Sequence, residues 1–271
     1  MADIVLKPPP KPNYLTKAID FCSRAVRGQL HLPPWWLRDV GGADFEAVGQ
    51  EFLEIFKQLA GLQPNERVLD IGCGSGRIAL PLTGYLNSEG SYTGVDIVNG
   101  SISWCRQHIT THYPNFRFEH ADLYNRRYNP TGQFQDEAYT FPVESGRFDF
   151  IFLTSVFTHM LPAGLENYLS EIARVLHPNG RALVTFFLLD GEQQTLASQG
   201  QNDIDFKFGS GSYRVRSEAV PESAVAYEQA FVRQTLRQKG LDIVEPIHYG
   251  TWSGRVDGLS YQDIVLVRPA R

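Results

Sequence analysis

Apolar and polar residues follow a repeating pattern from residue 65 onward. Short runs rich in β-branched and aromatic residues alternate with stretches in which apolar residues recur every three or four positions. The first kind of run predicts strands and the second predicts helices. The predicted strands cover residues 67–71, 92–97, 116–121, 148–154, 181–187, 241–249 and 261–268, and the predicted helices cover residues 78–86, 102–112, 165–176 and 223–239.

The last two predicted strands are joined differently from the others. Only a turn-rich link, residues 250–260, separates them, and this link is too short for a usual crossover helix. We therefore expect an antiparallel pair at the end of the sheet. The predicted fold is α/β: a doubly wound, Rossmann-like sheet of seven strands, mostly parallel with an antiparallel last strand, and with helices on both faces.

The first 60 residues have a different organisation. Asn13 and Asp44 are expected N-caps of two amphipathic helices, because each precedes a run with helical spacing of apolar residues. We interpret residues 1–60 as an N-terminal extension with cap helices, and residues 61–271 as the main domain. Two segments of that domain are long for plain loops and are expected binding or lid inserts: residues 124–147 and 188–222.

Composition and charge restrict the function classes. The chain has 271 residues, and 25 Lys and Arg against 30 Asp and Glu give a net charge of −5. This balance disfavours DNA binding, which normally needs a basic surface. Three widely spaced cysteines indicate neither a disulfide framework nor a thiolate zinc site. Since no apolar run has the length of a signal or a membrane span, a cytoplasmic protein is expected.

The most informative motif joins the first predicted strand to the helix after it. In VLDIGCGSGR (68–77), Asp70 ends the apolar run and three glycines follow at alternate positions. Glycine lets the backbone turn tightly and approach a ligand closely. A P-loop would end in Gly-Lys-Ser/Thr, and a dinucleotide fingerprint would have the spacing GxGxxG. A carboxylate before the turn favours a cationic ligand such as S-adenosylmethionine, although a purely structural turn is the competing interpretation.

Acidic residues also end the next two predicted strands. Asp96 lies in GVDI (94–97), and Asp122 lies in EHADL (119–123). Asp96 can accept hydrogen bonds from ribose hydroxyls, and Asp122 can accept one from an adenine amino group. Either acid alone could be a solvated strand end. Acids at three successive strand ends, the first of them next to a glycine turn, favour a nucleoside site.

With these motifs, the sequence resembles the class I S-adenosylmethionine-dependent methyltransferases over residues 65–268. The runs FDFIFLTSVFTHM (148–160) and ARVLHPNGRALVTFF (173–187) extend the likeness, and residues 248–255 resemble a bacterial subgroup. The resemblance implies S-adenosylmethionine as the cofactor and Cys73 as an ordinary occupant of the turn, not a nucleophile. The cofactor contacts that it implies are Asp70, Gly72, Cys73, Gly74, Gly76, Asp96, Ile97, Asp122, Leu123 and Thr154.

Residues after the fourth predicted strand and in the inserts are candidates for the acceptor side. His159 lies just past that strand, and an imidazole pKa near ~6.5 suits proton removal at neutral pH. Packing against the following loop is the alternative role for His159. Arginines could bind an acidic group of the acceptor and tryptophan could line an apolar pocket, although solvated arginines and a core tryptophan are the more ordinary interpretation. The expected acceptor contacts are Arg126, Arg214, Trp252 and Arg255.

These observations predict a methyltransferase that modifies a small-molecule or saccharide-like acceptor, at oxygen. One alternative is an accessory protein that binds S-adenosylmethionine or S-adenosylhomocysteine without catalysis, and another is a methyltransferase for a protein or RNA. The glycine spacing and Asp70 disfavour an NAD-dependent oxidoreductase. His108 and His112 lack an HExxH motif, so no metal is expected. The identity of the acceptor and the oligomeric state stay open.

Overall fold

The computed structural model describes residues 12–38, 44–126 and 128–270. The chain forms two compact units, of which the described residues are 12–133 and 134–270, and each unit is described by itself. Among the described helices, none combines the length and the apolar character that a membrane crossing requires.

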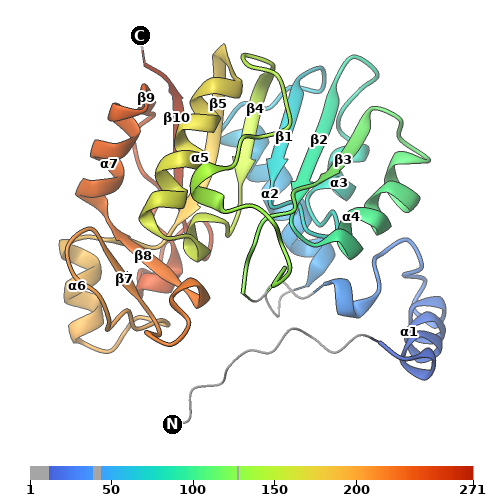
Figure 1. Cartoon of the computed structure of the whole chain (residues 1–271), viewed down its shortest axis with the longest axis horizontal. Coiled ribbons are helices and arrows are strands. Elements are labelled where there is room, and N and C mark those ends of the chain that lie inside the picture. The colour runs from blue at the N-terminus through green and yellow to red at the C-terminus, as the bar shows by residue number, and fades with distance from the viewer. Residues whose placement is uncertain (1–11, 39–43, 127, 271) are drawn as a thin grey trace. The chain divides into compact units, whose positions relative to one another are not determined.

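The first unit contains three parallel strands. β1 pairs with β2 from Arg67 opposite Ser91 to Ile71 opposite Val95, and β2 pairs with β3 in the same direction. Figure 1 shows these strands side by side with the helices of this unit around them. The elements are α1 (Tyr14–Val26), η1 (Trp35–Leu37), α2 (Phe45–Gln58), β1 (Arg67–Ile71), α3 (Ala79–Thr83), β2 (Ser91–Asp96), α4 (Asn99–Cys105), the π-helix η2 (Arg106–Thr110) and β3 (Phe116–His120).

Local sequence signals fix the helix starts and the core of this unit. The side chain of Asn13 accepts a hydrogen bond from the amide of Thr16, and that of Asp44 accepts from the first turn of α2. Both predicted N-caps are therefore confirmed. The ring of Tyr92 stacks on Phe116, with centroids 5.1 Å apart, inside the buried core of the three strands.

The second unit contains strands of a large sheet and of a smaller one. Its 3₁₀ helices are η3 (Asp136–Ala138), η4 (Phe157–His159), η5 (Pro221–Ser223) and η6 (Thr251–Ser253). The other elements are β4 (Phe148–Leu153), α5 (Pro162–Val175), β5 (Leu176–Phe186), β6 (Leu188–Leu189), α6 (Gly191–Ser198), β7 (Tyr213–Val215), β8 (Val225–Glu228), α7 (Gln229–Gln238), β9 (Leu241–Ile243) and β10 (Asp263–Pro269).

The main sheet has the predicted fold class. Its strand order is β3-β2-β1-β4-β5-β10-β9. β4 and β5 are parallel, whereas β10 is antiparallel to both β5 and β9. The seven-stranded sheet with an antiparallel end is therefore confirmed, because the short link before β10 forces a reversal instead of a crossover.

The segment 188–222, which is expected to be an insert because it is long for a plain loop, contains α6, β6 and β7. Two element predictions need correction. The helix predicted over residues 223–239 begins only at Gln229, because residues 225–228 form β8 between β6 and β7. The strand predicted over residues 241–249 ends at Ile243, shortly before Pro246, which has no amide hydrogen to donate to a ladder.

The smaller sheet, in the order β6-β8-β7, has its own apolar core. Phe187, Leu189 and Trp252 are buried there, and Ile204 and Phe206 pack against them. The ring of Phe187 meets that of Trp252 edge-on, with centroids 4.9 Å apart. Burial of three aromatic rings explains why strands of only two to four residues persist at this position.

Candidate functional site

The glycine turn after β1 has the left-handed backbone that its sequence predicts. Gly72, Gly74 and Gly76 have φ angles of +85°, +53° and +82°. A side chain on any of these residues would strain the turn, so glycine is required by conformation and not only by space. The amides of Gly72 and Cys73 both donate to the carbonyl of Val95, at 2.8 and 3.1 Å, which ties the turn to the end of β2.

Asp70 is a buried carboxylate that is only half satisfied. It is 1% exposed, and its Oδ2 accepts a hydrogen bond from the Tyr92 hydroxyl at 2.5 Å. Its Oδ1 is buried and has no hydrogen-bond partner among the described residues. Burial raises the pKa of Asp70 well above its ordinary value, the negative charge of Asp96 raises it further, and the bond from Tyr92 opposes both effects.

Asp96 holds the glycine turn in place from the end of β2. Its Oδ2 accepts from the amide of Gly74 at 2.8 Å, and its Oδ1 accepts from the amide of Val98 at 2.7 Å. Burial raises the pKa of Asp96, and these two amide bonds lower it. Ile97 follows directly, and its carbonyl accepts a hydrogen bond of 3.2 Å from Nε2 of His120. A ligand that meets Asp96 therefore meets a carboxylate already fixed in direction.

Asp122 lies in the segment that follows β3, next to the buried Leu123. Its Oδ1 accepts from the side-chain amide of Asn129 at 3.2 Å, and the same amide donates to the carbonyl of Leu123 at 2.9 Å. Sequence analysis did not single out Asn129, because an asparagine in a turn-rich segment has no distinctive pattern. The contact closes the loop back onto Asp122 and limits where its carboxylate can point.

These residues fit the cofactor that the resemblance implies. A side-chain carbon placed at Gly74 would meet no atom of the described residues within 4 Å, so open space lies against the turn. The unpartnered Oδ1 of Asp70 would suit an ammonium or sulfonium group, because a buried anion without a partner is unfavourable. Burial also raises the pKa of Cys73 well above its ordinary value, which keeps it a thiol and not a nucleophilic thiolate.

The second unit carries a strained residue where β4 ends. Thr154 is half-buried, and Ser155 after it has a φ of +58°, which is unusual for a residue with a side chain. The amide of Ser155 donates to Oγ1 of Thr185 at 2.8 Å, and that hydroxyl donates to Oε1 of Gln262 at 2.6 Å. The polar cluster Ser155–Thr185–Gln262 thus holds the turn after Thr154 in its strained form. Sequence analysis missed Gln262, because its partners are far away along the chain.

His159 has a defined hydrogen bond within the second unit. Its Nδ1 lies 2.9 Å from the carbonyl oxygen of Glu222, and since a carbonyl can only accept, Nδ1 carries the proton. In the neutral imidazole, Nε2 is then the basic nitrogen. Two buried hydroxyls belong to the short helices η4 and η5 on either side of this bond. They are those of Thr158 and Ser223, and neither has a hydrogen-bond partner in the described part of the chain.

The predicted acceptor contacts belong to both units. Arg126 lies on an exposed loop of the first unit. Arg214 is held within its own small sheet, because its guanidinium donates to the carbonyl of Tyr213 at 3.2 Å and lies 3.5 Å from the carboxylate of Glu228.

Trp252 and Arg255 have contacts that serve the folding of the second unit. Trp252 is fully buried, and its Nε1 donates to Asp263 at 2.9 Å. Arg255 donates to both carboxylate oxygens of Asp190, at 2.8 and 2.9 Å, and stacks over the ring of Tyr249. Its side chain is only 6% exposed. Both side chains are therefore committed to contacts within the fold of their unit.

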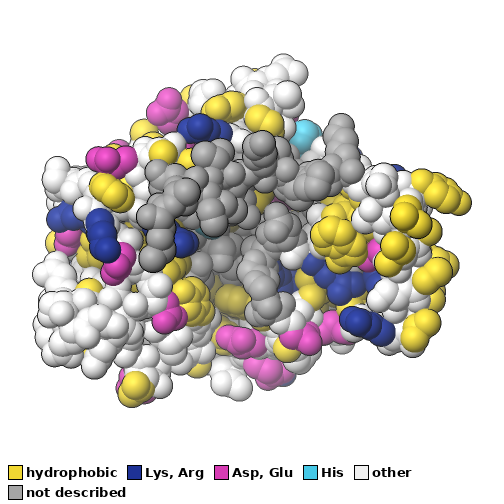
Figure 2. All heavy atoms as spheres, turned by 90° about the horizontal axis from the view of Figure 1, so that it is seen from below, with side chains coloured by type: hydrophobic (Ala, Val, Ile, Leu, Met, Phe, Trp, Pro, Cys, Tyr) yellow, Lys and Arg dark blue, Asp and Glu magenta, His cyan; other side chains and the backbone are white. Residues whose placement is uncertain are grey.

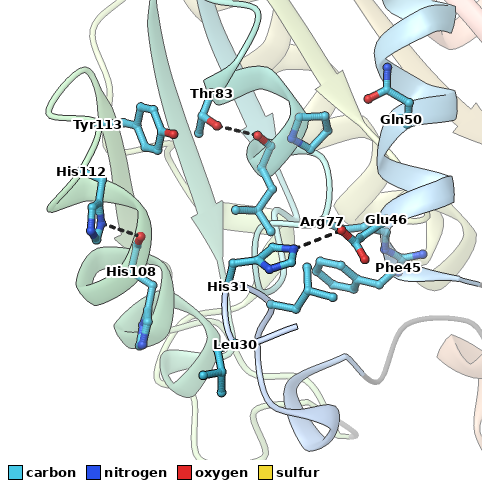
Figure 3. A pocket seen from close by; sticks show the side chains of 13 residues that line it. Leu30, His31, Phe45, Glu46, Gln50, Arg77, Thr83, His108, His112 and Tyr113 are labelled. Carbon is cyan, nitrogen blue, oxygen red and sulfur yellow. Dashed lines mark hydrogen bonds and ion pairs between the residues drawn. The ribbon is translucent and has the colours of Figure 1, made fainter. Parts of the chain in front are cut away.

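A separate cavity of about 640 Å³ lies among α2, α3 and η2 in the first unit (Figure 3). The ring nitrogen Nε2 of His31 lies 3.1 Å from the carboxylate of Glu46 at its wall. His108 and His112 also line it, but no group of three His, Cys, Asp or Glu residues in the described chain could hold a metal ion. The remaining lining residues are Leu30, Leu32, Phe45, Gln50, Arg77, Leu80, Pro81, Thr83 and Tyr113.

Comparison with known proteins finds a family match over part of the chain. Residues 68–180 match the family described as methyltransferase domain. A curated relative from Nostoc, 2-phytyl-1,4-naphtoquinone methyltransferase, is 27% identical over 163 residues, which is 56% of this chain. The aligned part covers 60% of that relative's length.

Solved structures share the fold. The 1,6-didemethyltoxoflavin-N1-methyltransferase of Burkholderia thailandensis, solved with its acceptor and S-adenosylhomocysteine, has a TM-score of 0.55 at 18% identity. It covers 95% of this chain and 88% of its own. Magnesium protoporphyrin IX methyltransferase of Synechocystis PCC 6803, solved with S-adenosylhomocysteine, has a TM-score of 0.53 at 16% identity and covers 94% of this chain and all of its own.

Proposed function

We propose that the chain carries a methyltransferase domain of the class I S-adenosylmethionine-dependent superfamily and that it methylates a small-molecule or saccharide-like acceptor at a hydroxyl oxygen. The single observation that carries the cofactor assignment is the buried Oδ1 of Asp70, which has no hydrogen-bond partner among the described residues. A cation seated there would remove the cost of burying a half-satisfied carboxylate.

In this proposal, each of the three acidic strand ends binds a different part of the cofactor. We assign Asp70 to the charged end, Asp96 to the ribose hydroxyls and Asp122 with Leu123 to the adenine. Asp96 is already fixed by the amides of Gly74 and Val98, so it can accept from a ribose without reorganising. Bound S-adenosylmethionine supplies an activated methyl group on a sulfonium. The chain's own contribution is therefore mainly to position the reactants and exclude water.

We assign His159 to removal of the acceptor proton. The bond from Nδ1 to the Glu222 carbonyl fixes the tautomer in which Nε2 is basic, which a general base requires. After proton transfer the imidazolium keeps its Nδ1 bond, and the carbonyl of Glu222 stabilises the added charge.

The names of the relatives support a small-molecule acceptor. The Nostoc protein is named for a naphthoquinone, and the Burkholderia structure contains a didemethyltoxoflavin. A protein or RNA acceptor is the alternative, and the net charge of −5 does not favour a polyanion. These compounds are named for those proteins and not for this chain. Here they indicate only which class of acceptor to test first.

Two experiments test the proposal in sequence. Calorimetry with S-adenosylhomocysteine should detect saturable binding that Asp70→Asn abolishes, and absence of binding to well-folded wild-type protein would overturn the cofactor assignment. A panel of phenolic, quinol and sugar acceptors is then incubated with S-adenosylmethionine, and S-adenosylhomocysteine formation is measured. With an active acceptor, His159→Gln should lower kcat by about 10²–10⁴-fold while leaving cofactor affinity unchanged. Unchanged turnover would remove His159 from the mechanism.

A further inference from the structure

Helix α1 exposes the side of the helix that a globular protein normally buries. The side chains of Tyr14, Leu15, Ile19 and Val26 are 88%, 67%, 62% and 89% exposed. Phe21 is 57% exposed, and the smaller residues of the same side are also exposed: Ala18, Cys22 and Ala25. At about 100° per residue, these eight positions fall within about 160° of the helix circumference. They form one continuous apolar face, which we call the α1 face.

The helix is attached to its unit through its polar side. Asp20 is 4% exposed and accepts hydrogen bonds from Nε of Arg24 at 2.7 Å and from the amide of Trp35 at 3.1 Å. Arg24 also donates to the carbonyl of Leu32 at 2.8 Å. Asp20 lies opposite the centre of the α1 face on the helix. The contacts that anchor the helix therefore point the apolar side chains away from the unit.

The apolar side chains of the α1 face are visible on the surface of the molecule. Along the edge where α1 lies, Figure 2 shows hydrophobic side chains on the outer side and basic side chains further in. Apolar residues scattered singly on a surface need no explanation, but a contiguous apolar face marks an interaction site. The amide of Thr16 donates to Oδ1 of Asn13 at 2.8 Å, and this N-cap stabilises the start of the helix from within the chain itself.

The charges around the α1 face favour an anionic partner. Lys17 of the helix and Arg27, its C-cap, are exposed, whereas the one acidic residue of the helix, Asp20, is buried and bonded to Arg24. The exposed charges that the helix carries are therefore positive, and they complement a negatively charged partner surface.

We propose that α1 binds the surface of an anionic lipid bilayer. The helix would lie in the plane of the membrane, with Leu15, Ile19 and Val26 among the acyl chains and Lys17 and Arg27 at the headgroups. Tyr14 and Phe21 are suited to the boundary between the two regions. This inference does not depend on the proposed methyl transfer, because it concerns a face of α1 that bears none of the residues assigned to the cofactor or the acceptor.

Co-sedimentation of the full chain with vesicles tests the proposal. Wild-type protein should bind vesicles of equimolar phosphatidylcholine and phosphatidylglycerol, and bind pure phosphatidylcholine vesicles about tenfold or more weakly, with binding lost as salt screens the headgroups. Ile19→Glu should weaken binding to the anionic vesicles by about tenfold or more. Gln58→Glu, an equal change of charge on an exposed position of α2, should bind like wild type.

Two results would overturn the proposal. Wild-type protein that stays in the supernatant with anionic vesicles would show that α1 is not a lipid-binding helix. A concentration-dependent dimer in light scattering, lost in Ile19→Glu and unaffected by vesicles, would show that a second copy covers the α1 face. Thermal unfolding and S-adenosylhomocysteine affinity of Ile19→Glu check that the variant is folded, so a loss of vesicle binding cannot be attributed to unfolding.

Discussion

The hydroxyl of Tyr92 lies 2.5 Å from Oδ2 of Asp70, inside the sheet and away from solvent. The register of β1 and β2 explains the contact. Val68 is opposite Tyr92 and Asp70 is opposite Gly94, so Tyr92 and Asp70 are diagonal neighbours on one face of the sheet. The tyrosine holds one carboxylate oxygen and leaves the other for a ligand. Tyr92 is therefore a positioning residue for the proposed cofactor site.

Substitution Tyr92→Phe should weaken S-adenosylhomocysteine binding. Loss of a hydrogen bond to a charged group costs about 1.5–3 kcal/mol, which corresponds to about 10–150-fold in Kd. The hydrogen bond from Tyr92 lowers the pKa of Asp70, so its removal should raise that pKa further. Since the ligand requires the carboxylate, binding by the variant should be lost at a higher pH than in wild type as the solution is acidified.

Calorimetry across a pH series measures both effects. Tyr85→Phe is the matched control, because the Tyr85 hydroxyl donates to the carbonyl of Leu62 and neither residue belongs to the cofactor site. That variant should keep wild-type affinity and pH dependence. Equal affinities for Tyr92→Phe and wild type at every pH would contradict the positioning role.

Substitution Asp70→Asn should stabilise the ligand-free protein at neutral pH. Because burial raises the pKa of Asp70 above its ordinary value of 3.8, the folded chain binds a proton more tightly than the unfolded chain. The free energy of unfolding therefore falls as pH rises from near 3.8 through the raised pKa. Neutral Asn at position 70 removes this pH-dependent loss of stability. Each kcal/mol by which the free energy of unfolding increases raises Tm by about 2–4 °C.

Thermal unfolding with and without ligand tests that expectation. The Tm difference between Asp70→Asn and wild type should shrink toward zero as the pH approaches 3.8. At about 100 times Kd, S-adenosylhomocysteine should stabilise wild type by about 2.7 kcal/mol and the variant not at all. A variant less stable than ligand-free wild type at neutral pH would mean that the Asp70 charge is compensated in the fold.

Alanine substitutions at Gly74 and Gly76 can be compared to separate an effect on ligand binding from an effect on stability. Gly74→Ala and Gly76→Ala both place a side chain at positive φ, which costs about 1–2 kcal/mol in each case. The added carbon at position 74 meets open space, whereas at position 76 it would lie 2.8 Å from Ile109. Gly74→Ala should therefore lose only the about 1–2 kcal/mol of backbone strain, but it should bind S-adenosylhomocysteine at least about tenfold more weakly, because the methyl group enters the proposed ligand space.

Gly76→Ala should instead lose stability. Overpacking against Ile109 adds about 1–3 kcal/mol to the backbone strain, for a Tm lower by several degrees. Chemical denaturation and calorimetry on both variants separate the two effects. If Gly74→Ala binds as tightly as wild type, the space beside Gly74 is not part of the ligand site.

The local parts of this architecture were visible in the sequence. β1 has the predicted bounds, because a run of buried apolar residues ends at a motif whose glycines need positive φ. The N-caps at Asn13 and Asp44 follow from short-range hydrogen bonding. Asp70, Asp96 and Asp122 could be singled out as candidates because each lies at the end of a strand or shortly after one. All these features depend on neighbours within a few residues along the chain.

The parts that depend on distant contacts could not be predicted. Tyr92 looks like an ordinary strand residue until the register places it beside Asp70. The strand β8 replaced the start of a predicted helix, because residues 225–227 are buried between two other strands. Arg255 lies in a turn, and the sequence alone could not show its contact with Asp190, which is 65 positions away along the chain.

Substitution Arg255→Met tests whether that arginine serves the fold. Methionine keeps an apolar stem over Tyr249 but leaves Asp190 without its bidentate partner. Breaking a buried pair costs about 3–5 kcal/mol, and because Asp190 is 19% exposed we expect about 2 kcal/mol, or a Tm lower by about 4–8 °C. Arg233→Met, which breaks an exposed pair with Glu245, should cost less than about 1 kcal/mol. If Arg255→Met keeps wild-type stability but has a raised KM for an active acceptor, Arg255 contacts the acceptor and is not required by the fold.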